Sequence, residues 1–157
     1  MLKGVSKVES GYAGGDKDNP SYEQVSGGST GHAEVIRVTY DPTVITYEDL
    51  LTVFFGSHDP TTLNRQGNDV GTQYRSVIFY SDDTEKTTAE RNSKEIQDSL
   101  TDGSHVVTQI VPLVNFFPAE QYHANYYEMN ADAPYCQIII EPKVEKVRKR
   151  FAELVKQ

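Results

Sequence analysis

The 157-residue sequence contains a single cysteine, Cys136, and no tryptophan. One cysteine excludes an internal disulfide framework, a Cys-x-x-Cys redox pair and a zinc site built from several thiolates. The four histidines lie far apart and show no ligand spacing, so nothing in the sequence supports a metal site. No apolar run approaches the roughly 20 residues that a bilayer requires, and no apolar signal region follows Met1. The sequence therefore predicts no membrane segment, and the cytoplasm is the expected location.

Basic residues are also scarce, since 15 Lys and Arg stand against 23 Asp and Glu, for a formal charge of −8. Phosphate backbones and anionic lipid repel an acidic chain, so we expect neither nucleic acid nor a membrane surface as a partner. The 37% of apolar residues, which include 10 Tyr and 6 Phe, predict a packed domain rather than disorder. At this length we expect one domain over residues 1–157, present as a monomer.

The apolar pattern predicts a mixture of strands and helices. Strands are expected over 5–11, 34–40, 75–80, 105–113 and 137–140. Helices are expected over 46–55, 81–100 and 118–129, and at the C-terminus with Val144, Val147, Phe151 and Leu154 on one face. The stretches 16–31 and 57–72 are predicted as polar loops. Two strands precede the first helix without a strict β-α-β rhythm, which favours an α+β fold with helices on a mixed or antiparallel sheet.

The helix expected over 46–55 has the clearest local signal. Thr46 and Asp49 have the spacing of a capping box, in which each side chain bonds the backbone N–H of the other residue. Three residues are expected to form the apolar stripe of this helix: Leu50, Leu51 and Phe54.

Glu34 is the first candidate for chemistry. It shares the parity of Ile36, Val38 and Tyr40, so in a regular strand its carboxyl group points to the same face as these apolar side chains. Desolvation raises the pKa of a carboxyl group, which makes it a proton donor near neutral pH. The alternative is that the strand begins after Glu34 and the carboxylate lies in solvent.

The loop over 64–75 is rich in glycine and in hydrogen-bonding side chains, as is typical of a segment held close to a ligand. Asp69 in this loop could position water or a polar group, or could satisfy its own backbone in a solvated turn. Tyr22 and Tyr74 could present phenol hydroxyls to a ligand oxygen, or could serve as packing residues. Cys136 adjoins an apolar run and shows no neighbouring base, which favours a structural cysteine.

Several longer motifs occur in a fixed order along nearly the whole chain. They are SGYAGG at 10–15, NPSYEQV at 19–25, TGHAE at 30–34, YDP at 40–42, HDP at 58–60, NRQGNDVGTQYRS at 64–76, FPAEQYHANY at 117–126 and YC at 135–136. In order and spacing they resemble the peptide methionine sulfoxide reductase A family. Members of this family reduce the S epimer of methionine sulfoxide, free or in proteins.

The resemblance implies a role for each candidate residue. Glu34 matches the acid that protonates the sulfoxide oxygen, Tyr22 and Tyr74 match the phenols that bond this oxygen, and Asp69 matches the loop carboxylate that organises the site. It also implies a ferredoxin-like two-layer α/β sandwich. No bound cofactor is implied, because the electrons come from thiols of a thioredoxin-like protein or from dithiothreitol.

The sequence departs from the family in more than one respect. The family's nucleophile lies in a Gly-Cys-Phe-Trp motif upstream of the segment that begins here at Met1, and this sequence lacks that motif. Cys136 matches a family cysteine that is not the nucleophile. The family's first strand and helix also have no counterpart, so we expect a truncated domain that is inactive alone and poorly stable.

Three hypotheses account for this departure. The first is a methionine sulfoxide reductase whose N-terminal segment is missing from the sequence as given. The second is a protein that binds a sulfoxide or a related polar ligand without turnover, and the third is a decayed fragment that does not fold cooperatively.

Overall fold

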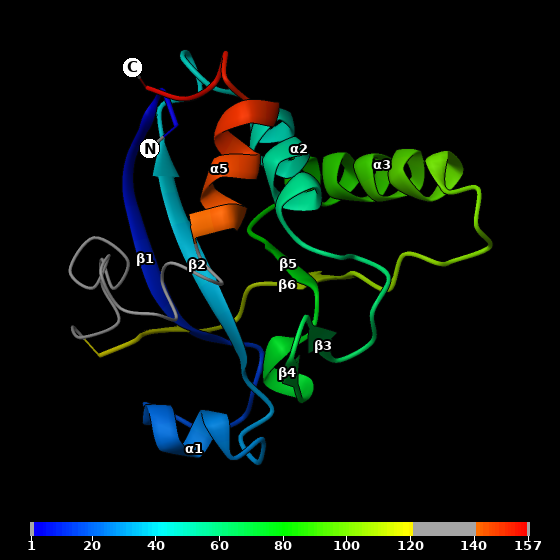
Figure 1. Cartoon of the computed structure of the whole chain (residues 1–157). Helices are drawn as coiled ribbons and strands as arrows, with labels where there is room; N and C mark the ends of the chain where they lie inside the picture. Colours follow the sequence, from blue (N-terminus) through cyan, green and yellow to red (C-terminus); the bar gives the residue numbers. More distant parts are fainter. Residues whose placement is uncertain (1, 121–140, 157) are drawn as a thin grey trace.

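The computed structural model describes residues 2–120 and 141–156, and it combines helices with sheets as expected for an α+β fold (Figure 1). The described strands form three separate groups. The largest is an antiparallel sheet in the order β2-β1-β7, made by Val5–Ala13 (β1), Ala33–Tyr40 (β2) and Phe116–Pro118 (β7). The others are a hairpin of Arg65–Gln66 (β3) with Asp69–Val70 (β4), and a parallel pair of Val77–Tyr80 (β5) with Gln109–Pro112 (β6). The described strands therefore do not join into the one sheet that the sequence favoured.

The β1–β2 ladder is the longest pairing among the described strands, and it fixes which side chains share a face. Tyr12 pairs with Glu34 and Ser10 pairs with Ile36, so these residues lie on one face. On the other face, Arg37 Nη2 lies 3.0 Å from Glu9 Oε2 across the ladder. This ion pair is exposed and contributes little to stability, but it agrees with the register.

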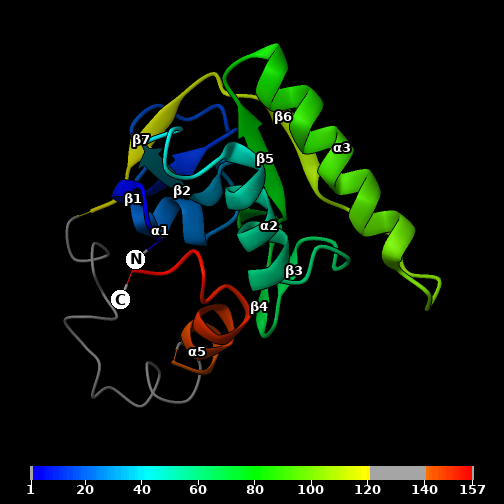
Figure 2. The same ribbon diagram turned by 90° about the horizontal axis from the view of Figure 1, so that it is seen from above.

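Helices Tyr47–Ser57 (α2) and Asp83–Ser99 (α3) pack together and against the β5–β6 pair, as the views in Figures 1 and 2 both show. The buried core of this part contains Leu51, Phe55, Ile78 and Ala89. Partly buried apolar residues surround it: Tyr47, Phe54, Ile96, Val106 and Ile110. This core supplies much of the apolar burial that holds the described fold together.

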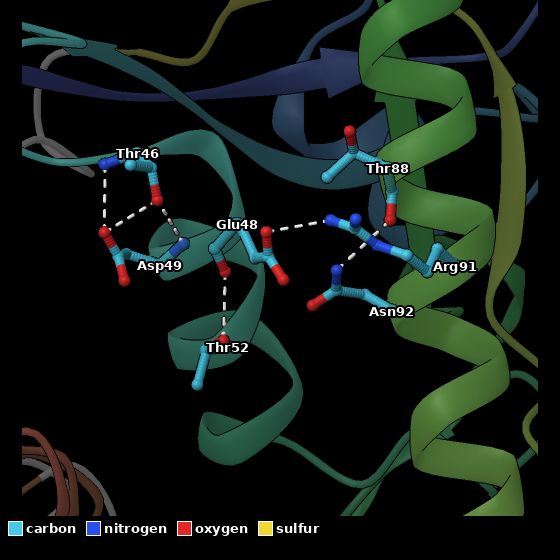
Figure 3. Close-up of polar contacts among 7 residues, drawn as sticks. All are labelled: Thr46, Glu48, Asp49, Thr52, Thr88, Arg91 and Asn92. Carbon is cyan, nitrogen blue, oxygen red and sulfur yellow. Dashed lines mark hydrogen bonds and ion pairs between the residues drawn. The ribbon is translucent and has the colours of Figure 1, made fainter.

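The predicted capping box starts α2 (Figure 3). Thr46 Oγ1 accepts the backbone N–H of Asp49 at 3.1 Å, and Asp49 Oδ2 accepts the backbone N–H of Thr46 at 3.0 Å. The same view shows the ion pair that joins α2 to α3, with Arg91 Nη2 2.8 Å from Glu48 Oε2. The start of α2 is therefore confirmed at Thr46.

The apolar stripe of α2 differs from the prediction. Leu51 is buried, but the second buried apolar residue is Phe55, while Leu50 and Phe54 are only partly buried. The reason is that Phe55 follows Leu51 by four residues on the same side of the helix and shares the buried core with Ile78 of β5 and Ala89 of α3. Helix α2 also contacts the C-terminal helix Glu141–Arg150 (α5). Phe151 packs so closely on Gly56 that a Cβ there would lie 2.5 Å from the ring.

The predicted loop over 16–31 contains a helix, Tyr22–Ser26 (α1). Its signal was present in the sequence, because Ser21 and Gln24 form a capping box. Surrounding glycine and proline suggested a loop, and contacts from distant residues, such as those that bury Val25 completely, give this short helix an anchor.

Pro118 ends β7 and does not open a helix, because residues 116–118 pair with β1. The rest of the helix predicted over 118–129 lies outside the described residues from position 121 onward. The strand predicted over 137–140 and Cys136 also lie outside them.

His58, the residue that follows α2, joins this helix to β5 and β6. Its Nδ1 donates to the carbonyl oxygen of Phe54 at 2.7 Å, because a carbonyl can only accept. Its Nε2 then accepts the hydroxyl of Ser76 at 2.7 Å, and the Ser76 oxygen lies 2.8 Å from Thr108 Oγ1. Burial lowers the pKa of His58, although the Phe54 carbonyl and the Asp59 charge oppose this shift.

This network predicts a loss of stability in mild acid. The unfolded chain binds a proton at an ordinary histidine pKa near roughly 6.5, whereas the folded chain resists protonation. The free energy of unfolding should therefore fall as the pH drops below that value. In urea titrations between pH 7.5 and 5.5, His58→Gln should show a shallower pH dependence than the wild type. Ser57→Ala is the control, since it removes the other donor to the Phe54 carbonyl but no titrating group, and equal slopes for His58→Gln would contradict the assignment.

Candidate functional site

Glu34 lies near the start of β2, directly across the ladder from Tyr12. The face that carries it is more open than its alternation predicts, because Ile36 is 64% exposed and Glu34 itself is accessible to solvent. Atoms packed around the carboxyl group nevertheless displace part of its water, and this desolvation raises the pKa of Glu34. Glu34 therefore keeps its proton at a higher pH than an ordinary glutamate does.

Asp69 is the second cause of the raised pKa of Glu34, since its negative charge disfavours a second carboxylate nearby. Asp69 begins β4 and pairs with Gln66 in the β3–β4 hairpin, whose turn contains Gly67 at a φ of +59°. The hairpin is tied to the following turn, because the N–H of Gly71 donates to the Asn64 carbonyl at 2.9 Å. The carboxyl groups of Glu34 and Asp69 therefore lie near each other, although the two residues are far apart in the sequence.

Tyr74 ends the 3₁₀ turn Thr72–Tyr74 (η1), which packs against β2. Partial burial raises the pKa of the Tyr74 phenol, and the nearby charges of Glu34, Asp69 and Tyr22 raise it further. A phenol with a raised pKa stays protonated over a wider pH range and remains a hydrogen-bond donor. Since the charges of Glu34, Asp69 and Tyr22 all act on the pKa of Tyr74, these groups lie near it. The structure thus brings the four residues predicted from the sequence into one cluster.

The glycine-rich segments 11–15 and 27–31 are held together through His32, which is 1% exposed. The N–H of Gly15 donates to His32 Nδ1 at 3.0 Å, so the proton is on Nε2, which donates to the Lys17 carbonyl at 2.7 Å. A Cβ at Gly15 would lie 2.3 Å from the carbonyl oxygen of Thr30, so only glycine permits this approach. Glu34 follows His32 by two residues, and its place depends on this contact.

Arg75 links the Tyr74 turn to the segment before β2. Its Nη2 donates to the Gly31 carbonyl at 3.0 Å, its Nη1 to the Thr72 carbonyl at 2.8 Å and its Nε to Gln109 Oε1 at 3.2 Å. All three acceptors are neutral, and desolvation lowers the pKa of Arg75. The planar guanidinium group fits this arrangement because its donors point in fixed directions.

Sequence reasoning singled out neither His32 nor Arg75, and it also passed over Glu120. The Glu120 carboxylate accepts the hydroxyl of Tyr12 at 2.8 Å and the backbone N–H of Tyr22 at 2.8 Å. These residues lie within the quoted motifs, but their partners are distant in the sequence. No local pattern indicates such contacts.

No metal site accompanies the cluster, because nowhere in residues 2–120 and 141–156 do three His, Cys, Asp or Glu side chains gather in an arrangement fit for a metal ion. The helices within those residues are too short or too polar to cross a membrane. A surface hollow on α5, lined by Lys146, Lys149 and Arg150 among others, shares no residue with the cluster. The functional groups of the cluster are thus two carboxyl groups and two phenols.

Comparison with known proteins gives a family match over nearly the whole chain. The family model for peptide methionine sulfoxide reductase matches residues 1–155. The peptide methionine sulfoxide reductase MsrA of Chromobacterium violaceum is 50% identical over 155 residues, which are 99% of this chain and 88% of that protein. The MsrA of Sulfolobus acidocaldarius is 50% identical over 152 residues, which are 97% of this chain and 85% of that protein.

Solved structures give the same result. Mxr1 from Saccharomyces cerevisiae in its reduced form has a TM-score of 0.78 and 41% identity, with 84% of this chain and 75% of that chain covered. Methionine sulfoxide reductase A of Corynebacterium diphtheriae also has a TM-score of 0.78, with 34% identity over 82% of this chain and 65% of that chain. The chain therefore belongs to the peptide methionine sulfoxide reductase family, which is a family of enzymes.

The proximity of Asp69 to Glu34 predicts the result of a charge deletion. Asp69→Asn should lower the pKa of Glu34 toward its ordinary value, because the repulsion from the neighbouring carboxylate is removed while desolvation remains. The titration of the Glu34 side chain is measured by NMR on the ¹³C-labelled chain. Asp98→Asn, a charge deletion on the exposed face of α3, should leave this titration unchanged, and a Glu34 pKa that does not respond to Asp69→Asn would refute the proximity.

Proposed function

We propose that this chain binds methionine S-sulfoxide, free or in proteins, and donates a proton to its oxygen in a thiol-dependent reduction to methionine. Glu34 is the acid, Tyr22 and Tyr74 donate hydrogen bonds to the oxygen, and the charge of Asp69 adds to the desolvation that raises the pKa of Glu34. The observation that carries this proposal is the raised pKa of Glu34 beside a phenol that also stays protonated.

The chemistry of the sulfoxide favours this arrangement. Its oxygen is a strong hydrogen-bond acceptor with partial negative charge, so a carboxylate would repel it and a carboxylic acid would bind it. Protonation weakens the S–O bond and makes the sulfur electrophilic, as general-acid catalysis requires. Two phenol donors aimed at the same oxygen stabilise the charge during transfer.

The complete reaction needs a thiol. A thiolate attacks the sulfur of the protonated sulfoxide and forms an S–S bond, while the S–O bond breaks and a second proton lets the oxygen leave as water. Water then adds to the sulfur of the former thiolate, the S–S bond breaks, and the products are methionine, a sulfenic acid and a proton. A second thiol then converts the sulfenic acid to a disulfide and releases water, so one sulfoxide and two thiols give methionine, one disulfide and water. We propose a thioredoxin-like protein or dithiothreitol as the source of reducing equivalents, with no bound cofactor.

We further propose that this domain has the ferredoxin-like sandwich of the family. The sequence lacks the Gly-Cys-Phe-Trp motif, and its one cysteine, Cys136, lies outside the described residues. The described residues therefore account for sulfoxide binding and proton donation only. We propose that this chain binds the substrate but does not complete turnover by itself.

Binding is tested through its pH dependence. The affinity for methionine S-sulfoxide, measured by NMR titration, should fall by roughly 2- to 10-fold as Glu34 ionises, because one hydrogen bond to the oxygen is lost. In Glu34→Gln the affinity should become independent of pH over this range, since the amide does not titrate. Glu90→Gln on α3 is the matched control and should keep the wild-type profile, and methionine, which lacks the oxygen, should bind weakly at every pH. Identical profiles for the wild type and Glu34→Gln would contradict the assignment of the acid.

Turnover is tested separately by chromatographic detection of methionine, with dithiothreitol as the reductant. The chain should form no more methionine than Cys136→Ser does. Robust turnover that disappears in Cys136→Ser would overturn this expectation and assign the thiolate to Cys136.

A further inference from the structure

Glu120 lies just after β7, and its carboxylate contacts two elements at once. One oxygen, Oε2, accepts the hydroxyl of Tyr12 on β1 at 2.8 Å. The other, Oε1, accepts the backbone N–H of Tyr22, the first residue of α1, at 2.8 Å. A single carboxylate therefore joins the central strand of the antiparallel sheet to the start of the helix that carries a candidate site residue.

The contact with Tyr12 gives Glu120 a fixed position. Tyr12 is 2% exposed, so its ring is held by packing, and its hydroxyl has a defined direction. In the β1–β2 ladder Tyr12 pairs directly with Glu34, on the same face of the sheet. The carbonyl of Ser10 also accepts the N–H of Ala119 at 2.9 Å, which holds the backbone before Glu120 against β1. Glu120 is thus anchored to the strand position opposite the candidate acid.

The contact with Tyr22 acts on a helix that cannot hold its own position. Helix α1 has five residues, and so short a helix is not stable in water by itself. Its N–H groups at the first turn have no partner within the helix, and Glu120 supplies one for Tyr22 while the Ser21–Gln24 capping box supplies others. Figure 1 shows α1 beyond the end of β1 at which Ala13 lies, connected to it by a long loop. The place and direction of α1 therefore depend on contacts from outside the helix.

From this geometry we propose that Glu120 is a positioning residue for the sulfoxide site: it fixes the start of α1 relative to the Tyr12–Glu34 pair and so holds the Tyr22 phenol in the candidate site. Glu120 acts through Tyr22 and does not touch the substrate. The inference rests on the proposed function, because the benefit of a fixed Tyr22 is the hydrogen bond that its phenol gives to the sulfoxide oxygen.

A double-mutant cycle tests this role. Glu120→Ala should weaken the binding of methionine S-sulfoxide by about 3- to 10-fold, the size of one lost hydrogen bond. Tyr22→Phe should weaken it by a similar factor. The two effects should not multiply, because once the phenol is absent its position has no further influence. Glu120→Gln should recover much of the affinity, since its amide oxygen can still accept the Tyr22 N–H.

Glu23→Ala is the matched control. It removes the neighbouring carboxylate of α1, which accepts the hydroxyl of Ser21 but does not contact Tyr12, and it should change the affinity little. A purely structural Glu120 would instead weaken binding in the Tyr22→Phe background as much as in the wild type. That result, or a loss in Glu23→Ala as large as in Glu120→Ala, would overturn the proposal.

A measurement without ligand tests the positioning role of Glu120 separately from the proposed binding of the sulfoxide. Hydrogen exchange of the Tyr22 backbone amide should be slow in the wild type and faster in Glu120→Ala, while amides of the α2–α3 core keep their protection. Equal exchange at Tyr22 in both chains would overturn the positioning role even if the sulfoxide binds. A wild-type chain that fails to bind the sulfoxide while the Tyr22 amide responds as expected would instead overturn the proposed function, and with it the benefit assigned to Glu120.

Discussion

The close approach of two glycine-rich segments at Gly15 and His32 is the constraint on which the site depends. The N–H of Gly15 bonds the buried imidazole, and no side chain at position 15 could fit against the Thr30 carbonyl. This contact closes the end of the β1–β2 ladder, where Tyr12 pairs with Glu34. Backbone geometry and a hydrogen-bonded histidine therefore hold the strand position of the candidate acid.

The candidate site and the main apolar core are built from different parts of the chain. Helices α2 and α3 and the β5–β6 pair bury the apolar side chains, whereas the candidate residues come from short polar segments that bury few of them. Desolvation and the charge of Asp69 both oppose the ionisation of Glu34, which does not favour folding at neutral pH. Hydrogen bonds of His32 and Arg75 to backbone groups hold these segments in place despite that repulsion.

The sequence predicted the regular elements best where the signal was local. The capping box at Thr46, the strand over 34–40 and the long polar helix before residue 100 agree with α2, β2 and α3 to within a few residues. It failed where a distant partner decided the outcome. Strand pairing with β1 made Pro118 the end of a strand, and packing against β5 and α3 buried Phe55. Helix α1 was missed because surrounding glycine outweighed its capping box.

The sequence by itself determined the types of residue available for chemistry, since parity and loop composition made Glu34, Asp69, Tyr22 and Tyr74 candidates and the family resemblance implied their roles. Only the tertiary structure decided that these four groups meet, and that desolvation and a neighbouring charge act on Glu34. It also revealed the supporting contacts of His32, Arg75 and Glu120. The physical reason is that a pKa and a hydrogen bond depend on distances in space, and those distances are set by strand register and loop closure rather than by neighbours in the chain.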